Sequence, residues 1–285
     1  MEIRTIGVVG AGTMGNGIAQ VCAAAGYPVV VTDIAQAALD RALKTIDGSL
    51  ERMVNKQKLT AADKAATLSR LTMSTDMKSL SDCDLVIEAA TENAGLKLKI
   101  FAAIDATVKE SAIIASNTSS ISITKLAAAT KRPAQFIGMH FFNPVPVMAL
   151  VELIRGMQTS EDTLQAVRAV VLKIGKAPIV VRNSPGFAVN RILVPMLNEA
   201  CFALGEGVAT PEDIDEGMKL GCNHPIGPLA LCDMIGLDVM LDVMNVFYAS
   251  FNDPKYRPAP LLVEMVEAGY LGRKSGRGFY NYEKK

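Results

Sequence analysis

The sequence has little of several residue types that carry specialised chemistry. It contains two histidines, His140 and His224, and five scattered cysteines that form no C-x-x-C pair. Cys222 and His224 together supply at most half of a four-ligand zinc site, so we expect no metal. An odd number of scattered cysteines does not suit a disulfide framework and favours a reducing, cytoplasmic location.

Net charge is also absent, since 29 Lys and Arg residues balance 29 Asp and Glu residues. The chain therefore has no excess of positive charge that would attract nucleic acid or an anionic membrane. The stretch between Arg4 and Asp33 has no charged residue, but six glycines and Pro28 interrupt it and no basic segment precedes it. We therefore expect neither nucleic acid nor membrane as a partner, and a small molecule instead.

The length of 285 residues and the 50% hydrophobic content are sufficient for two folded domains. Short apolar runs alternate with helical segments over residues 1–183, which predicts an α/β domain of Rossmann type with a mostly parallel sheet. Its strands are expected at 3–9, 28–32, 84–88, 112–115, 136–142, 148–154 and 178–181. Residues 35–69 exceed the length of one crossover helix and predict a helical pair.

A turn-rich break, Asn183-Ser184-Pro185-Gly186, marks the end of this alternation. Residues 184–285 show helical periodicity and few strand signals, which predicts an all-helical C-terminal domain. Its helices are expected at 187–204, 211–220, 236–251 and 261–268.

A glycine motif follows the first predicted strand and opens a predicted helix. The segment Gly10-Ala11-Gly12-Thr13-Met14-Gly15 matches G-x-G-x-x-G, whose glycines let a pyrophosphate lie on the helix N-terminus. Asp33 ends the second strand, where a carboxylate binds ribose hydroxyls and repels a 2′-phosphate. These features predict a nicotinamide dinucleotide site that favours NAD over NADP; the alternative is a glycine-rich turn without a ligand.

His140 and Glu152 form a second candidate site. They lie in two apolar runs that flank Asn143-Pro144-Val145-Pro146, and a chain reversal there would bring them opposite each other. A carboxylate that accepts a hydrogen bond from one imidazole nitrogen fixes the tautomer and lets the other nitrogen exchange a proton with substrate. The alternative is a core histidine with satisfied hydrogen bonds and an exposed glutamate on a strand.

Five motifs occur in order across nearly the whole chain. They are Gly10 to Gly17, Ser116-Asn117-Thr118-Ser119-Ser120, His140-Phe141-Phe142-Asn143-Pro144, Pro185-Gly186-Phe187 followed by Val189-Asn190-Arg191, and Gly278-Phe279-Tyr280. On these motifs the sequence resembles the (S)-3-hydroxyacyl-CoA dehydrogenases, and among them most closely the bacterial 3-hydroxybutyryl-CoA dehydrogenases. The resemblance implies an N-terminal NAD-binding domain, a helical domain that dimerises, and interconversion of (S)-3-hydroxybutyryl-CoA and acetoacetyl-CoA.

The resemblance also implies roles for individual residues. It assigns catalysis to His140 and Glu152, and contact with the substrate oxygen to Ser119 and Asn190. The implied contacts of the nicotinamide and its ribose are Glu92, Lys97, Asn117, Ser119, Asn143 and Lys274. Arg52 and Lys56 would face the phosphates of CoA. The chain has no hydratase domain, so we expect coupling to a separate enoyl-CoA hydratase and thiolase.

Other functions are weighed against this hypothesis. Ser119 is not in a G-x-S-x-G elbow, and Arg273 replaces the glycine that a phosphate-binding loop would need before Lys274 and Ser275, so a hydrolase and a nucleoside triphosphatase are disfavoured. A related dehydrogenase of a free sugar acid such as gulonate, and a catalytically silent NAD-binding protein, remain alternatives. The basic pair Arg52 and Lys56 favours CoA over a sugar acid.

Overall fold

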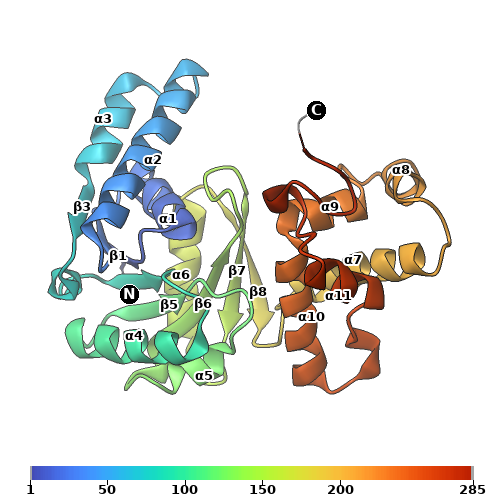
Figure 1. Ribbon diagram of the computed structural model, residues 1–285. Coiled ribbons are helices and arrows are strands. Elements are labelled where there is room, and N and C mark those ends of the chain that lie inside the picture. Colours follow the sequence, from blue (N-terminus) through green and yellow to red (C-terminus); the bar gives the residue numbers. More distant parts are fainter. Residues whose placement is uncertain (1, 284–285) are drawn as a thin grey trace. The chain divides into compact units, whose positions relative to one another are not determined.

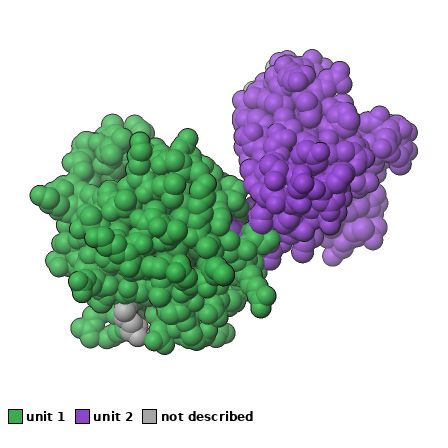
Figure 2. Space-filling view, turned by 90° about the horizontal axis from the view of Figure 1, so that it is seen from below, with its two compact units in different colours: residues 1–184 green, residues 185–285 purple. Residues whose placement is uncertain are grey.

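The computed structural model describes residues 2–283. The chain divides into two compact units, residues 1–184 and residues 185–285, called unit 1 and unit 2 (Figures 1 and 2).

Unit 1 contains an eight-stranded sheet in the order β3-β2-β1-β4-β5-β6-β7-β8. The strands are β1 (Ile6–Val9), β2 (Val29–Thr32), β3 (Leu71–Ser74), β4 (Leu85–Glu88), β5 (Ile113–Ser116), β6 (Phe136–Phe141), β7 (Leu150–Arg155) and β8 (Ala177–Arg182). Every neighbouring pair is parallel except β6 and β7, which are antiparallel. The carboxyl ends of β1, β4, β5 and β6 therefore share one edge of the sheet, where ligands bind in open α/β sheets.

Helices cover both faces of this sheet (Figure 1). They are α1 (Thr13–Ala24), α2 (Gln36–Asn55), α3 (Ala61–Ser69), α4 (Ala94–Thr107), α5 (Ile123–Ala127) and α6 (Glu161–Lys173). Apolar residues of α1, α2 and α6 share one core with the sheet, whereas Phe101 of α4 stacks edge-on against Phe136 on β6. The predicted helical pair is confirmed as α2 and α3, which pack side by side.

Local sequence explains both helices of this pair. In α2 the buried residues Leu39, Ala42, Ile46 and Leu50 recur every three or four positions, so one stripe of the helix faces the core. The start of α3 is fixed by a capping box, in which Thr60 and Asp63 satisfy each other's backbone amides.

The first strand is tied to its neighbour by a carboxylate. Asp84, just before β4, accepts hydrogen bonds from the backbone amides of Arg4 (2.8 Å) and Thr5 (2.9 Å). It also pairs with Lys109 at 2.7 Å. Burial alone would raise the pKa of Asp84, but the hydrogen bonds from Lys109 and the two amides outweigh burial and lower it.

Unit 2 is helical, as predicted. Its helices are α7 (Val189–Gly205), α8 (Pro211–Cys222), α9 (Pro228–Ile235), α10 (Leu237–Phe251) and α11 (Pro260–Glu267). Leu197 of α7, Leu229 of α9, Met244 and Phe247 of α10 and Leu262 of α11 are fully buried in one core. Within residues 2–283, no helix combines the length and the apolar character needed to cross a membrane.

Three elements escape sequence-based prediction. Strand β3 lies at the edge of the sheet and is only half-buried, so it lacks a strong apolar run. Helix α5 has five residues, fewer than two turns. Helix α9 is separated from α10 only by Gly236, whose φ of +105° breaks the helix without a loop.

Candidate active site

The β6–β7 hairpin places His140 directly opposite Glu152, as the predicted chain reversal requires. The His140 Nδ1 atom lies 2.7 Å from Glu152 Oε2, and both side chains are buried. A buried carboxylate can only accept a hydrogen bond here, so Nδ1 carries the proton and the tautomer is fixed. Phe142 packs against the imidazole with the two ring centres 4.6 Å apart. Proton exchange with a substrate would then take place at Nε2.

The glycine motif forms the turn between β1 and α1, at the same sheet edge as His140. Gly10 has φ +100°, and a Cβ on Gly15 would lie 1.8 Å from the Gly10 carbonyl oxygen. At Gly12, by contrast, no described atom outside the two adjacent residues lies within 4 Å of where a Cβ would be. Gly12 is also the N-cap residue and offers no side-chain oxygen to the first amides of α1. Open space in front of these amides suits a pyrophosphate.

A cavity of about 280 Å³ adjoins this loop and suits the adenosine half of a dinucleotide. Its walls are largely apolar and include Ile34, Met77, Leu96 and Ile100, together with Asp33. Asp33 follows β2, and its carboxylate accepts hydrogen bonds from the amides of Ala11 (2.9 Å) and Ala35 (3.1 Å). The residues of unit 1 therefore fit an adenine and its ribose.

The loop after β5 carries Ser119 and is held by Glu92. The Oε1 atom of Glu92 accepts hydrogen bonds from Thr118 Oγ1 (2.7 Å), Ser119 N (2.8 Å), Ser119 Oγ (3.1 Å) and Ser120 Oγ (3.3 Å). Asn117, from the same loop, accepts a hydrogen bond from the amide of Phe141, so the loop is also attached to the end of β6. Glu92 and the end of β6 therefore both fix the position of the loop that carries Ser119.

Lys97, predicted to contact the nicotinamide half, lies in a buried ion pair. Its ammonium group contacts Glu88, the last residue of β4, and both side chains are at most 1% exposed. Glu88 also accepts hydrogen bonds from the amide of Ala90 (2.9 Å) and from Ser116 Oγ (3.2 Å). Glu88 is not among the residues predicted from the sequence. A charged residue at the end of the otherwise apolar strand Leu85–Glu88 is the signal that could have indicated it.

A second cavity, of about 570 Å³, is lined by Arg52, Lys56 and Lys58 on one side. The turn between β6 and β7, residues 143–147, forms the other side, and Thr13, Asn16 and Gln20 of α1 contribute to the wall. Arg52 and Lys56 are four residues apart, so they share a face of the helical segment. The structure therefore brings the predicted basic pair together with Asn143 and adds Lys58.

The β6–β7 turn is secured by Lys176, which sequence analysis also missed. Its buried ammonium donates hydrogen bonds of 2.6 Å to the carbonyl oxygens of Val145 and Met148. Burial lowers the pKa of Lys176. The Lys176 side chain therefore provides the hydrogen-bond donors for two carbonyl groups inside the turn that positions Asn143.

Nearly all of the described chain matches one family of enzymes. Residues 5–184 match the 3-hydroxyacyl-CoA dehydrogenase NAD binding domain, and residues 186–282 match the 3-hydroxyacyl-CoA dehydrogenase C-terminal domain. The chain belongs to the 3-hydroxyacyl-CoA dehydrogenase family. The predicted family is therefore confirmed, and with it an oxidoreductase that has a nicotinamide dinucleotide domain.

Relatives of this dehydrogenase align over nearly their full lengths. A 3-hydroxybutyryl-CoA dehydrogenase of Bradyrhizobium diazoefficiens is 54% identical over 280 residues, which cover 98% of this chain and 96% of the relative. One of Clostridioides difficile is 50% identical, with 98% and 99% covered. The crystal structure of (S)-3-hydroxybutyryl-CoA dehydrogenase from Ralstonia eutropha is 66% identical, with a TM-score of 0.98, and covers 99% of this chain and 100% of that one.

Two predicted site residues of the dehydrogenase, Asn190 and Lys274, belong to unit 2. Asn190 is the second residue of α7 and is half-buried. Lys274 pairs with Asp238 at the start of α10, with its Nζ atom 2.5 Å from Oδ1. No group of three or more metal-ligating side chains lies together among residues 2–283.

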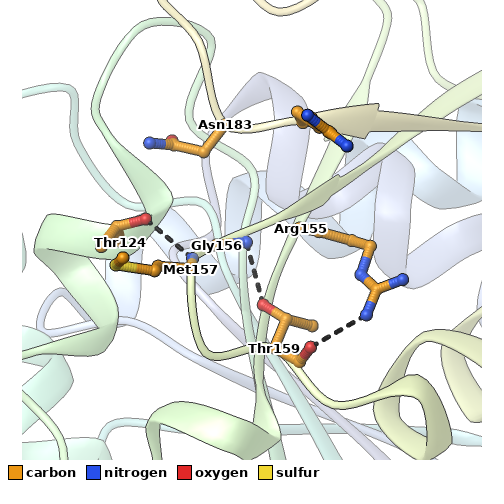
Figure 3. A pocket seen from close by; sticks show the side chains of 7 residues that line it. Thr124, Arg155, Gly156, Met157, Thr159 and Asn183 are labelled. Carbon is orange, nitrogen blue, oxygen red and sulfur yellow. Dashed lines mark hydrogen bonds between the residues drawn. The ribbon is translucent and has the colours of Figure 1, made fainter.

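A further cavity of about 500 Å³ lies at the carboxyl ends of β7 and β8. Figure 3 shows Arg155, Thr124 and Thr159 around it, with Arg155 donating to the Thr159 carbonyl oxygen. This end of β7 pairs with the beginning of β6, so it lies at the sheet edge opposite His140. None of the predicted site residues lines this cavity.

Proposed function

We propose that this dehydrogenase interconverts (S)-3-hydroxybutyryl-CoA and acetoacetyl-CoA, with NAD as its cofactor. The observation that carries the proposal is the buried His140–Glu152 pair at the sheet edge that also holds the glycine loop. A general acid/base positioned beside a dinucleotide site is what hydride transfer at an alcohol carbon requires. The names of the three relatives support the four-carbon CoA thioester as substrate.

In the oxidative direction His140 accepts the hydroxyl proton at Nε2, and in the reductive direction the imidazolium returns it to the forming alkoxide. Glu152 stabilises the imidazolium through Nδ1. The glycine loop and Asp33 would hold a nicotinamide dinucleotide, which would supply the hydride chemistry. General acid/base action of this kind contributes about 10² to 10⁴-fold to the rate, so the remainder depends on positioning and electrostatics.

Ser119 and Asn190 are proposed to orient the substrate oxygen. Asn143, Asn117 and Glu92 are proposed contacts of the nicotinamide half, together with Lys274 of unit 2. Lys97 is only 1% exposed, so we propose that it serves this half indirectly, through its carboxylate partners.

NAD is proposed over NADP because of Asp33. Its carboxylate borders the adenosine cavity and already accepts two backbone hydrogen bonds, so it is held in place. A 2′-phosphate beside it would be repelled, whereas ribose hydroxyls can donate to it.

The decisive experiment is a spectrophotometric assay of acetoacetyl-CoA reduction with NADH and with NADPH, using the purified protein. NADH-dependent turnover supports the proposal. Turnover of a gulonate-type sugar acid but not of acetoacetyl-CoA would establish the alternative substrate class. Binding of NADH without turnover of either substrate would establish a silent NAD-binding protein.

The CoA part of the proposal rests on the basic cavity and has its own test. Arg52→Ala with Lys56→Ala should raise KM for acetoacetyl-CoA about tenfold with little loss of kcat, because distant phosphate contacts hold ground and transition states alike. The rise should shrink with salt. Arg41→Ala with Lys44→Ala removes the same charge from exposed positions of the same helix and should leave KM unchanged. An equal loss with a truncated thioester would refute phosphate binding.

Homodimerisation, a cytoplasmic location and coupling to a separate enoyl-CoA hydratase and thiolase are also proposed. Exposed apolar side chains on unit 2 support a partner surface there; they include Ile192, Val208, Leu220 and Met234. Light scattering of the purified protein tests the dimer, and a monomeric mass would refute it.

A further inference from the structure

The Glu88–Lys97 ion pair is buried directly behind the loop that carries Ser119. Taking two charged groups out of water costs several kcal/mol for each, so such a pair is seldom retained for stability alone. Lys97 is also in the first turn of α4, where a positive charge opposes the helix dipole. Its position is therefore explained by the two carboxylates that it faces, Glu88 and Glu92.

The two carboxylates are not equivalent. Glu88 is in direct contact with the ammonium group and is fully buried, whereas Glu92 Oε2 lies 3.7 Å from Lys97 Nζ and the side chain is 45% exposed. Glu92 uses its other oxygen, Oε1, for the donors of residues 118–120. Lys97 is thus shared unequally: its closer contact is with Glu88, and its longer contact is with Glu92, which holds the Ser119 loop.

We propose that Glu88 is a positioning residue for the substrate-oxygen contact: it holds the charge of Lys97 and so leaves Glu92 to position Ser119. This inference rests on the role of Ser119 in the proposed function. With Glu88 neutral, Glu92 would be the nearest carboxylate to a buried ammonium group. The attraction would draw Glu92 toward Lys97 and away from the loop.

The consequence for Ser119 follows from the two hydrogen bonds that Glu92 accepts from it. The hydroxyl donates to Glu92, and the same carboxylate oxygen accepts from the Ser119 amide, so both the backbone and the rotamer of Ser119 are set by Glu92. Displacement of Glu92 would leave both the backbone and the rotamer of Ser119 without this restraint. Misplacing a positioning group by about 1 Å can cost on the order of 10²-fold in rate.

The test is a double-mutant cycle of Glu88→Gln with Ser119→Ala, measured as kcat for acetoacetyl-CoA reduction. Glu88→Gln alone should lower kcat about 10- to 100-fold. In the Ser119→Ala background it should lower kcat less than about twofold, because the group that it positions is gone. Equal losses in both backgrounds, or a wild-type kcat for Glu88→Gln, would overturn the inference.

Stability is controlled by a matched variant. Asp105 of α4 pairs with Arg132 at 2.6 Å, and this ion pair is also largely buried but makes no contact with the Ser119 loop. Asp105→Asn should lower the Tm and leave kcat unchanged. Glu88→Gln combined with Lys97→Met removes the attraction on Glu92, so Glu92 should keep its contact with Ser119 in a crystal structure of this double variant. A double variant that folds but in which Glu92 still leaves Ser119 would overturn the inference.

A crystal structure of Glu88→Gln gives a readout that does not depend on activity. The inference requires Glu92 to move from Ser119 toward Lys97; an unmoved Glu92 would overturn it. If the wild-type protein does not reduce acetoacetyl-CoA, the proposed function fails. The position of Glu92 in the Glu88→Gln structure would still show whether Glu88 keeps Glu92 in contact with Ser119.

Discussion

Replacing Glu152 with Gln removes one charge from the buried pair and keeps a side chain of the same size. The amide oxygen can still accept a hydrogen bond from His140 Nδ1, which lies 2.7 Å from the carboxylate in the wild-type protein. A hydrogen bond to a charged group contributes about 1.5–3 kcal/mol and a neutral one about 0.5–1.5 kcal/mol. The difference, about 1–1.5 kcal/mol, acts when the imidazole becomes protonated, so kcat should fall about 5- to 13-fold.

The assay is oxidation of (S)-3-hydroxybutyryl-CoA at saturating NAD over a range of pH. Because the imidazolium loses its counter-charge, the acidic limb of the profile should shift to lower pH, while the Kd for NADH stays unchanged. Glu161→Gln, which alters an exposed glutamate paired with Arg155, is the matched control and should change neither quantity. A kcat within twofold of wild type and an unshifted profile would remove Glu152 from the mechanism.

Three further predictions concern unit 1. His140→Gln should lower kcat about 10² to 10⁴-fold with an unchanged Kd for NADH, and near wild-type turnover would contradict its role. Asp33→Ser with Ile34→Arg should improve kcat/KM with NADPH and weaken it with NADH, unless the wild-type protein already prefers NADPH, which would show the argument to be wrong. Asp84→Asn should lower stability by about 1–2 kcal/mol at pH 7. Because the folded pKa of Asp84 is lowered, this stability is lost as the pH falls through that pKa, so the Tm difference from wild type should close below about pH 4 and a constant difference would refute it.

Sequence patterns predicted those parts of the site that depend on short-range order. The glycine loop follows its strand directly, and the facing positions of His140 and Glu152 follow from a reversal at the turn between them. The role of Glu88 could not be predicted in this way. Lys97 lies nine residues further on, across the loop into α4, and the two meet only once helix and strand pack. Contacts between a strand and the helix that follows it depend on how the two pack in the tertiary fold.

The same limit applies to Glu92. Its sequence neighbourhood indicates a polar loop, but its four donors come from the loop after the next strand. Only the parallel pairing of β4 with β5 brings the two loops together. Short elements could not be predicted for a different reason. The five residues of α5 are too few to show a helical period in the sequence.

The Lys176 anchor has a consequence for attempts to redesign this enzyme. One turn connects the strand of His140 to the strand of Glu152 and also walls the basic cavity, and Lys176 binds two of its carbonyl groups. Insertions or deletions there would alter the basic cavity and the His140–Glu152 pair together. Val147 is 75% exposed within this wall, so its side chain can be varied while the backbone stays clamped. A library of Val147 variants would therefore change the wall of the basic cavity and leave the His140–Glu152 pair unchanged.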